Sequence, residues 1–332
     1  MTEKKYSGIL VFAEQKNLKL NNVVYELLGK GKKLSEKLNC PINAVVLGPC
    51  NLNIQELIYR GADKVYHIND DEIFNMPDEL VYSENIVSLI NNIKPEICLF
   101  GATTFGRSLA PRVAASLHTG LTADCTDLQI DEDMKLVQIR PAFSENILAH
   151  IKSDTYPQMS TVRYKEFEEA ETDMTRTGEI INVEPIRIHN NAVEILKEIT
   201  NENINITDAR VVVSAGVAVK SAEDLNMVRK LAELLGGEVG ASRALVETGL
   251  ISKEHQVGYS GNRVKPIIYI ACGISGAPQH LAGMKDSDTI IAINNDPSAP
   301  IFNIADYSIV GDLYKIIPEL IKSIQNNELI IN

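Results

Sequence analysis

The chain has 332 residues, 45% of them hydrophobic, which is enough for two globular domains with separate cores. Acidic residues outnumber basic ones by 44 to 32, so the formal net charge is -12, and the basic cluster that stands out lies at residues 30–33. A nucleic-acid interface needs an excess of positive charge, so we expect no nucleic-acid partner.

No apolar run approaches the roughly 20 residues that a membrane-spanning helix needs. The first residues pass from a polar tip into a strand-like run, without the pattern of a signal or transit peptide. The cysteines are scattered, with neither CxxC pairs nor iron–sulfur spacing: Cys40, Cys50, Cys98, Cys125 and Cys272. We therefore expect a cytoplasmic protein with reduced thiols, no metal and no membrane contact.

Short apolar runs alternate with helical periodicity in the first part of the chain. Strands are predicted at residues 8–13, 42–47, 64–68 and 97–100, and helices at residues 23–38, 54–58, 83–93 and from near Ser108. This alternation predicts a mostly parallel sheet covered by helices.

The pattern changes after Leu121. Residues 128–130, 136–139, 147–151 and 159–162 are strand-like without helices between them, which predicts antiparallel extensions that close the first domain. A strand-like run at residues 180–188 and a helical one at 193–199 follow. We place the domain boundary near Glu202, which gives domains of residues 1–202 and 203–332.

The second domain repeats the strand–helix alternation. Buried strands are predicted at residues 210–214, 266–271, 289–293 and 307–310. One helix is expected to begin at a Ser221 cap with Asp224 three residues later and to stop at Gly236, and another to cover residues 313–324. The expected fold class is therefore α/β, with two Rossmann-like doubly wound domains.

Four glycine-containing loops follow strands of the second domain. They are SAG at residues 214–216, GASR at 240–243, QVGYSG at 256–261 and GISGAPQH at 273–280. Glycine lets backbone amides approach an anion closely, and a helix start favours negative charge, so the loops predict a cradle for one large phosphorylated cofactor. Each loop taken alone is also compatible with a simple turn, and the chain lacks the GxSxG and GxxxxGK[ST] motifs.

Three side chains in these loops have two interpretations each. Arg243 has a guanidinium that pairs with a planar anion or, alternatively, with Glu238 or Glu247. Ser260 is a turn hydroxyl or a donor to a redox-active ring, and His280 is a solvent-exposed loop residue or a donor to a carbonyl that gains charge on reduction.

Taken together, the motifs resemble the alpha subunit of electron-transfer flavoprotein. The second-domain segments that carry the resemblance are residues 239–243, 256–261, 269–284, 291–302 and 305–312. The first domain is similar to the family at residues 100–112 and 157–163, so the resemblance covers nearly the whole chain.

The resemblance implies a heterodimer in which the first domain packs on a beta subunit and the second, a parallel-sheet domain, binds FAD. It implies that Arg243 and Ser242 lie at the isoalloxazine, that Ser260 bonds a ring nitrogen and that His280 faces the pyrimidine carbonyl. The implied cofactor-binding residues are Ser242, Arg243, Gln256, Val257, Gly258, Tyr259, Ser260, Ser275, Gly276, Ala277, Pro278, Gln279, His280, Asn294, Asp312 and Leu313. The implied function is electron relay, without a catalytic residue that transforms a substrate.

The chain departs from the family at three places. Val217 stands where many members have the arginine of Gly-Arg-Gly, so Lys220 or backbone amides are expected to compensate at the pyrophosphate. Tyr259-Ser260 replaces the common Gln-Thr, and Pro278 replaces an aliphatic residue.

The variants at residues 259–260 and 277–280 are similar to alpha subunits that serve lactate-type dehydrogenases in anaerobes, and residues 120–126 also resemble anaerobic members. Some of those bifurcate electrons from NADH to ferredoxin and a second acceptor. The resemblance leaves a lactate-type or an acyl-CoA dehydrogenase as the partner, with NADH and ferredoxin reached through the beta subunit. From the loops alone, an NAD-dependent dehydrogenase on the same fold and a non-catalytic scaffold stay open as alternatives.

Overall fold

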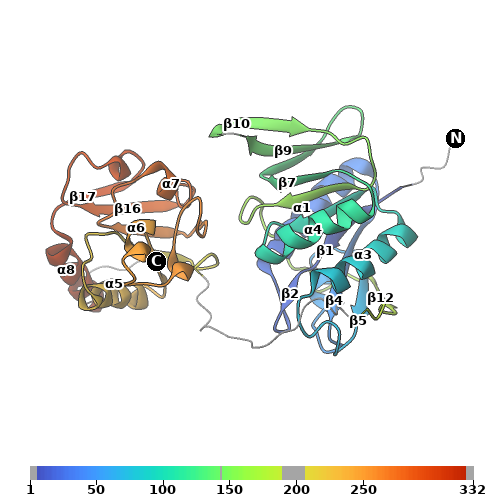
Figure 1. Ribbon diagram of the computed structural model, residues 1–332, viewed down its shortest axis with the longest axis horizontal. Coiled ribbons are helices and arrows are strands. Elements are labelled where there is room, and N and C mark those ends of the chain that lie inside the picture. The colour runs from blue at the N-terminus through green and yellow to red at the C-terminus, as the bar shows by residue number, and fades with distance from the viewer. Residues whose placement is uncertain (1–5, 143, 189–205, 327–332) are drawn as a thin grey trace. The chain divides into compact units, whose positions relative to one another are not determined.

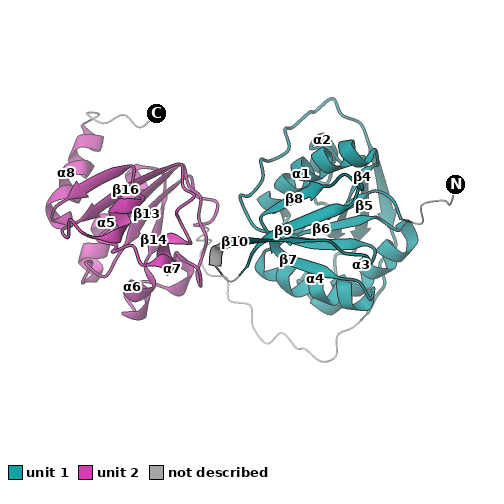
Figure 2. Ribbon diagram, turned by 90° about the horizontal axis from the view of Figure 1, so that it is seen from above, with its two compact units in different colours: residues 1–195 teal, residues 196–332 magenta. Residues whose placement is uncertain are grey.

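A computed structural model describes residues 6–142, 144–188 and 206–326. The chain divides into two compact units, residues 1–195 and 196–332, which Figure 2 shows in different colours. The expected boundary near Glu202 and the helix expected at residues 193–199 both lie outside the described residues. The exact boundary therefore stays a prediction.

Unit 1 (residues 1–195) is built on a seven-stranded sheet in the order β12-β5-β4-β1-β6-β11-β7, and all neighbouring strands in it are parallel. All residues of β4 are buried, as expected for a parallel sheet covered on both faces. The strands are β1 (Ile9–Phe12), β4 (Ile42–Gly48), β5 (Lys64–Asn69), β6 (Ile97–Gly101), β7 (Leu121–Cys125), β11 (Gln158–Val162) and β12 (Glu179–Val183).

Helices cover both faces of this sheet (Figures 1 and 2). On one face lie α1 (Asn22–Leu38) and α2 (Gln55–Tyr59), and on the other α3 (Glu79–Ile93) and α4 (Thr104–Ser116). Their starts follow local chemistry, since the side chains of Asn21, Asp78 and Thr103 accept hydrogen bonds from backbone amides of α1, α3 and α4. The predicted alternation of strands and helices is confirmed here.

The antiparallel extension is confirmed for residues 127–151 but wrong for residues 159–162. A separate antiparallel sheet contains β8 (Asp127–Ile130), β9 (Leu136–Ala142) and β10 (Ser144–Ile151), and β2 (Gln15–Lys16) pairs with β3 (Lys19–Leu20) in a small ribbon. Strand β11 instead lies between β6 and β7, parallel to both and entirely buried. The expectation rested on the absence of helices between these strand-like runs, which does not determine where a strand pairs. The polar residues of β11 are satisfied inside the sheet, since Ser160 accepts a hydrogen bond from Gln138 at 2.7 Å and Thr161 one from the amide of Asp124 at 2.8 Å.

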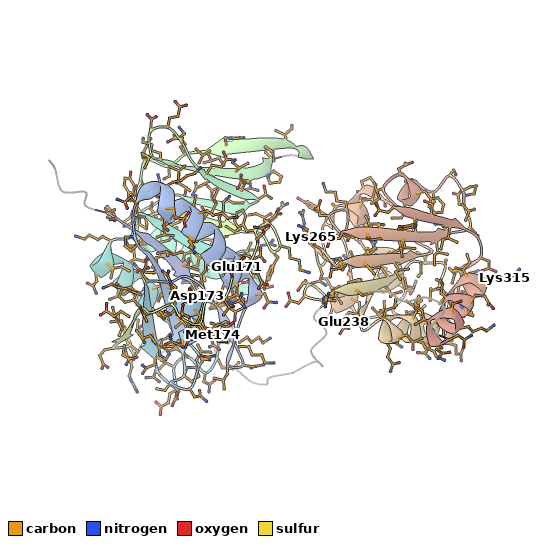
Figure 3. All side chains as sticks on the ribbon, turned by 180° about the vertical axis from the view of Figure 1, so that it is seen from behind. Glu171, Asp173, Met174, Glu238, Lys265 and Lys315 are labelled. Carbon is orange, nitrogen blue, oxygen red and sulfur yellow. The ribbon has the colours of Figure 1, made fainter. Side chains whose placement is uncertain are left out.

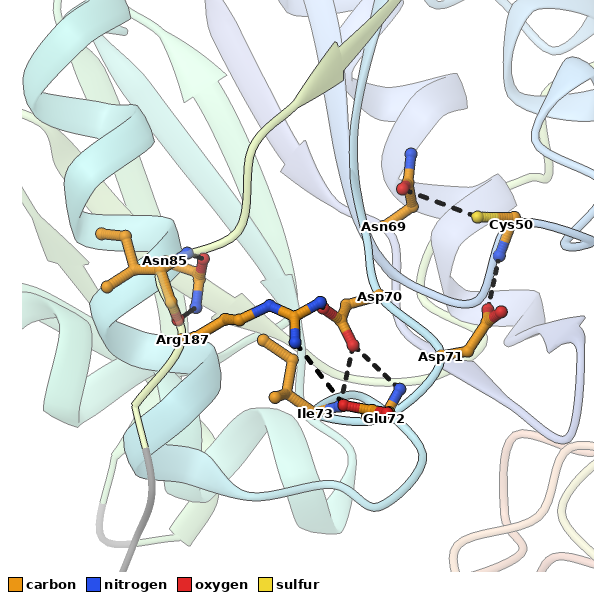
Figure 4. Close-up of polar contacts among 9 residues, drawn as sticks. Cys50, Asn69, Asp70, Asp71, Glu72, Ile73, Asn85 and Arg187 are labelled. Atoms are coloured by element: carbon orange, nitrogen blue, oxygen red, sulfur yellow. Dashed lines mark hydrogen bonds and ion pairs between the residues drawn. The ribbon is translucent and has the colours of Figure 1, made fainter.

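A polar cluster follows the carboxyl end of β5 (Figure 4). The carboxylate of Asp70 accepts from the amides of Glu72 and Ile73 at 2.8 and 3.1 Å and pairs with Arg187 at 2.6 Å. Asn85 on α3 bonds both backbone groups of Ile186, at 2.7 and 3.1 Å. These contacts hold the segment after β12 against α3 and the β5 turn, so the cluster is structural.

A carboxylate of α1 is buried in the core of unit 1. The Glu26 side chain is 3% exposed and accepts from the amides of Lys165 and Phe167 at 3.0 and 3.3 Å. Burial raises its pKa to about 7, with Glu169 contributing in the same direction and the amides opposing. Because a raised pKa in the folded state favours the protonated carboxyl, the contribution of Glu26 to stability is fully present below pH 4.5 and is lost as pH rises through 7.

Replacing Glu26 by glutamine is expected to remove this pH dependence. Between pH 4.5 and 8 the free energy of unfolding of the wild-type chain should fall by about 3 kcal/mol more than that of Glu26→Gln, the equivalent of the pKa shift. Urea unfolding at pH 4.5 and pH 8 measures the difference. Glu36→Gln, at an exposed position of the same helix, is the matched control and should keep the wild-type slope. Equal slopes for Glu26→Gln and wild type would contradict the assignment.

Unit 2 (residues 196–332) contains a five-stranded parallel sheet in the order β14-β13-β15-β16-β17. The strands are β13 (Val211–Ala215), β14 (Glu238–Ala241), β15 (Ile268–Cys272), β16 (Thr289–Asn294) and β17 (Tyr307–Val310). Four of the five were predicted within a few residues. The expectation that residues 307–310 are buried is wrong, because β17 is an edge strand whose Tyr307 is 64% exposed.

Two apolar clusters cover the two faces of this sheet. Helices α5 (Ala222–Leu234) and α8 (Leu313–Gln325), with α6 (Arg243–Glu247), pack into one, and residues after β15 that include Leu281 and Met284 pack into the other. The remaining helical segments are α7 (Pro278–Leu281) and two 3-10 turns, Lys253–His255 and Pro300–Asn303. The predicted cap of α5 is confirmed as a full capping box between Ser221 and Asp224.

Candidate functional site

The strand order of unit 2 creates a crevice at the carboxyl ends of β13 and β15. Numbered along the chain from β13, the order is 2-1-3-4-5, so the connections from strands 1 and 3 leave to opposite faces of the sheet. The loops after these strands touch, since a Cβ on Gly216 would lie 2.0 Å from the carbonyl oxygen of Gly273. Doubly wound sheets bind ligands at such a point.

The GASR loop continues this edge after β14. Ser242 caps α6, accepting from the amide of Leu245 at 3.3 Å, while its own amide donates to Ala215 at 2.9 Å. Arg243 begins α6, and its Nε lies 2.8 Å from Glu247, with the arginine side chain 69% exposed. Of the two salt-bridge partners considered for Arg243, Glu247 is therefore the one present. Glu238 is the first residue of β14 and lies at the opposite end of that strand (Figure 3). An exposed pair of this kind contributes about 0–1 kcal/mol, so an anion can compete for the guanidinium.

The QVGYSG loop lies against the GASR loop. Gln256 bridges Ala241 in parallel, and the amide of the buried Val257 donates to the Ala241 carbonyl at 2.9 Å. The Gln256 side chain is 5% exposed and donates through Nε2 to the Ser260 hydroxyl at 3.2 Å. Ser260 accepts that bond, so its own proton is available to a ligand. Tyr259 and Ser260 are both exposed.

Backbone contacts join this loop to the GISGAPQH loop. The amide of Tyr259 donates to the carbonyl of Gln279 at 2.7 Å, and a Cβ on Gly258 would lie 2.8 Å from the same oxygen. Gly258 also has a φ of +145°, in the region that favours glycine. Alanine at this position is thus excluded by both contact and conformation.

The GISGAPQH loop packs against the backbone of Ile301. Ser275 accepts from the amide of Ile301 at 3.0 Å, and a Cβ on Gly276 would lie 2.3 Å from that amide nitrogen. Ala277 precedes α7, Pro278 occupies its first turn, and the side chains of Ser275, Ala277, Pro278 and Gln279 are exposed along this loop.

His280 is buried rather than solvent-exposed, which corrects the simpler interpretation of this loop residue. Its side chain is 6% exposed, and Nε2 lies 2.9 Å from the hydroxyl of Tyr269, a fully buried residue of β15. Nδ1 is buried, and no described residue offers it a partner in hydrogen-bonding geometry. Burial lowers the pKa of the imidazole to about 4, with the Val257 backbone opposing, so the ring is neutral near pH 7. Tyr269 was not among the predicted site residues, although a tyrosine in an aliphatic strand signals a buried polar contact.

The three residues expected at the adenosine end lie at the end of β16 and after β17. Asn294 donates to the Ile274 carbonyl at 2.9 Å and accepts from the amide of Asp296 at 3.0 Å, while Asp312 caps α8 and Leu313 is buried. The amide of Gly311 donates to the carbonyl of Asn294 at 2.9 Å, so the ends of these two strands are neighbours.

Near Val217, two of the backbone amides that could compensate for the missing arginine are already engaged. Val217 is 53% exposed, and the amides of Lys220 and Ser221 donate to the Asp224 carboxylate at 3.2 and 3.1 Å. Tyr314 donates to the Ala218 carbonyl at 2.9 Å and lies 3.0 Å from the same carboxylate. The side chain of Lys220 is exposed and is therefore accessible to a phosphate.

Comparison with known proteins agrees with this arrangement. Residues 9–187 match the electron transfer flavoprotein domain, and residues 205–285 match the electron transfer flavoprotein FAD-binding domain. The chain belongs to the electron transfer flavoprotein alpha-subunit family. The implied cofactor is thus confirmed as FAD, and the buried, unpartnered Nδ1 of His280 and the close-packed glycine loops fit such a group.

Similar proteins include alpha subunits and electron-transfer subunits of anaerobes. The electron transfer flavoprotein subunit alpha of Thermoanaerobacterium thermosaccharolyticum is 48% identical, over 96% of this chain and 98% of the relative. The lactate dehydrogenase (NAD(+),ferredoxin) subunit LctC of Acetobacterium woodii is 42% identical, over 97% of this chain and 78% of the relative. The acryloyl-CoA reductase electron transfer subunit beta of Anaerotignum propionicum is 37% identical, over 97% of each.

Two further features are absent from the described ranges. Within them, no cluster of three or more histidine, cysteine or acidic side chains is arranged to hold a metal ion. In the same part of the chain, no helix has the length and apolar character needed to cross a membrane.

Proposed function

We propose that this chain pairs with a beta subunit and holds FAD in the loops at the carboxyl edge of the unit 2 sheet. The observation that carries the proposal is the continuous contact of the loops after β13, β14 and β15 with residues 256–261, on a family FAD-binding domain. The residues proposed to bind FAD are Ser242, Arg243, Gln256, Val257, Gly258, Tyr259, Ser260, Ser275, Gly276, Ala277, Pro278, Gln279, His280, Asn294, Asp312 and Leu313.

Bound FAD would supply reversible one- and two-electron redox chemistry. Arg243 would leave Glu247 to face negative charge that develops on the flavin ring, and Ser260, oriented by Gln256, would donate its proton to a ring nitrogen. His280 would donate from Nδ1 to the pyrimidine carbonyl. The protein would thus tune electron transfer by charge and hydrogen bonds, without a general base.

We further propose that the electrons come from or go to a flavin-linked dehydrogenase of the lactate or acyl-CoA type. Support comes from the names of two relatives, a lactate dehydrogenase (NAD(+),ferredoxin) subunit and an acryloyl-CoA reductase electron transfer subunit. NADH and ferredoxin would be reached through the beta subunit in a bifurcating complex. A cytosolic location is proposed from the five cysteines, all free in the structure.

Purification of the chain with its beta subunit tests these proposals. A yellow heterodimer with a flavin spectrum is expected, and a colourless preparation that takes up no FAD would contradict the proposed site. Two FAD for each heterodimer would favour bifurcation, whereas one FAD with one AMP would favour simple transfer. Reduction by NADH in the presence of a lactate-type or an acyl-CoA dehydrogenase, one at a time, identifies the partner class.

A further inference from the structure

Tyr269 and His280 form a buried polar pair next to the proposed flavin site. The Tyr269 side chain is fully buried in β15, and its hydroxyl lies 2.9 Å from Nε2 of His280, whose side chain is 6% exposed. The two rings are tilted, with centroids 6.2 Å apart, so this contact is an edge-on hydrogen bond rather than a stacking interaction.

The direction of this hydrogen bond follows from what surrounds the phenol. Burial raises the pKa of Tyr269 far above its ordinary value, so the phenol keeps its proton at neutral pH. The Ser214 hydroxyl is near enough to oppose that shift, but it reaches no partner in hydrogen-bonding geometry within the described residues. His280 Nε2 is therefore the acceptor available to the phenolic proton, and a buried donor left without an acceptor is strongly unfavourable.

A neutral imidazole that accepts at Nε2 carries its proton on Nδ1. In His280, Nδ1 is buried, and the Val257 backbone, which is close enough to the ring to act on its pKa, does not reach it in hydrogen-bonding geometry, nor does any other group among the residues that the structure describes. The backbone around it is tightly placed, since a Cβ on Gly258 would lie 3.5 Å from the Cα of His280. Nδ1–H is thus a fixed donor that no group in the described residues satisfies with good geometry.

We propose that Tyr269 is a positioning residue that fixes His280 in the tautomer protonated on Nδ1, so that His280 donates a hydrogen bond to FAD. The proposal deepens the proposed function and rests on the placement of His280 at the cofactor. Tyr269 itself would not touch FAD. Without the Tyr269 hydroxyl, the imidazole proton is free to move to Nε2. Nδ1 would then present a lone pair to the ligand's carbonyl oxygen, which also has one.

The tautomer is measured first, without FAD. The heterodimer is prepared flavin-free with ¹⁵N-labelled histidine in this chain, and long-range ¹H–¹⁵N spectra report which ring nitrogen of His280 is protonated, with His280→Asn used for assignment. Protonation of Nδ1 is expected in wild type, and a shift of the proton toward Nε2 is expected in Tyr269→Phe. Tyr307→Phe, at an exposed tyrosine of the same unit, should match wild type. Protonation of Nε2 in wild type would overturn the proposal.

The effect on FAD is measured second, by titrating FAD into the same heterodimers. Tyr269→Phe is expected to weaken FAD binding by about tenfold, the order of one lost hydrogen bond. In a His280→Ala background the same change should have no further effect, because Tyr269 acts through the imidazole. An equal loss in both backgrounds would show that Tyr269 acts by packing and would overturn the proposal.

The two levels of failure are distinguishable. If His280→Ala binds FAD as tightly as wild type, the placement of His280 at the cofactor fails, and the role of Tyr269 in binding fails with it, whatever tautomer is observed. If wild type binds FAD and His280→Ala does not, while the tautomer is unchanged in Tyr269→Phe, the proposed function stands and the positioning role of Tyr269 is overturned.

Discussion

The Gly276→Ala chain is expected to be purified with its beta subunit without bound FAD and to be less stable by roughly 3 kcal/mol. Gly276 has a φ of +89°, and an added Cβ would lie 2.3 Å from the amide nitrogen and 2.7 Å from the Cα of Ile301. Both neighbours are backbone atoms, so the loop must move. The movement would break the bond from the Ile301 amide to Ser275 and displace the segment that leads to His280.

Urea unfolding and the flavin content after purification measure the two effects. Gly249→Ala is the matched control, because Gly249 has a φ of +79° but nothing lies within 4 Å of its added Cβ. That variant should lose about 1 kcal/mol of stability, from backbone strain alone, and keep its FAD. A Gly276→Ala heterodimer that retains FAD at the wild-type ratio would contradict the placement of this loop at the cofactor.

The second large effect is expected from Arg243→Ala. The arginine side chain is 69% exposed, and its guanidinium is held by a surface ion pair with Glu247, so it is available to a flavin that becomes anionic on reduction. Its removal should disfavour one-electron reduction by about tenfold, which lowers the reduction potential of bound FAD by about 59 mV. Spectroelectrochemical titration of the heterodimer measures this shift.

Two further variants separate a local from a general charge effect. Arg229→Ala removes an exposed arginine of α5 that bonds Asn226 at 3.1 Å, and it should leave the potential unchanged. Glu247→Gln frees the guanidinium from its ion pair, so the potential should rise or stay constant. A potential that falls equally in Arg229→Ala and Arg243→Ala would mean that net charge, and not Arg243 at the ring, is responsible.

Much of the site was predictable from the sequence because its signals are local. The cap of α5 by Ser221 and Asp224 depends on residues three apart, and it is present as expected. The salt bridge between Arg243 and Glu247 spans one helical turn and was one of the stated alternatives. The identity of the loops followed from a resemblance that the family comparison confirms.

Features that depend on distant residues were missed. Strand β11 contains polar residues that are satisfied by Gln138 and Asp124, and these partners are set by sheet order rather than by the strand itself. From its loop sequence alone, His280 is compatible with an exposed position. Its burial depends on the contact with Tyr269, which is placed by β15. The Asp224 carboxylate likewise accepts hydrogen bonds from the amides of Lys220 and Ser221, so fewer backbone amides are free to bind a phosphate than the loop sequence suggested.

The two α/β units, most of their strands, the cap of α5 and the family were predictable from the sequence, because periodicity, capping and motif identity are short-range properties. Only the tertiary structure decided the strand orders, the contact of Gly216 with Gly273, and the burial of His280 against Tyr269. Parallel pairing joins strands that are far apart in the chain, so no local pattern encodes which edges meet. For the same reason, the partner of a buried polar group becomes known only when the sheet is assembled.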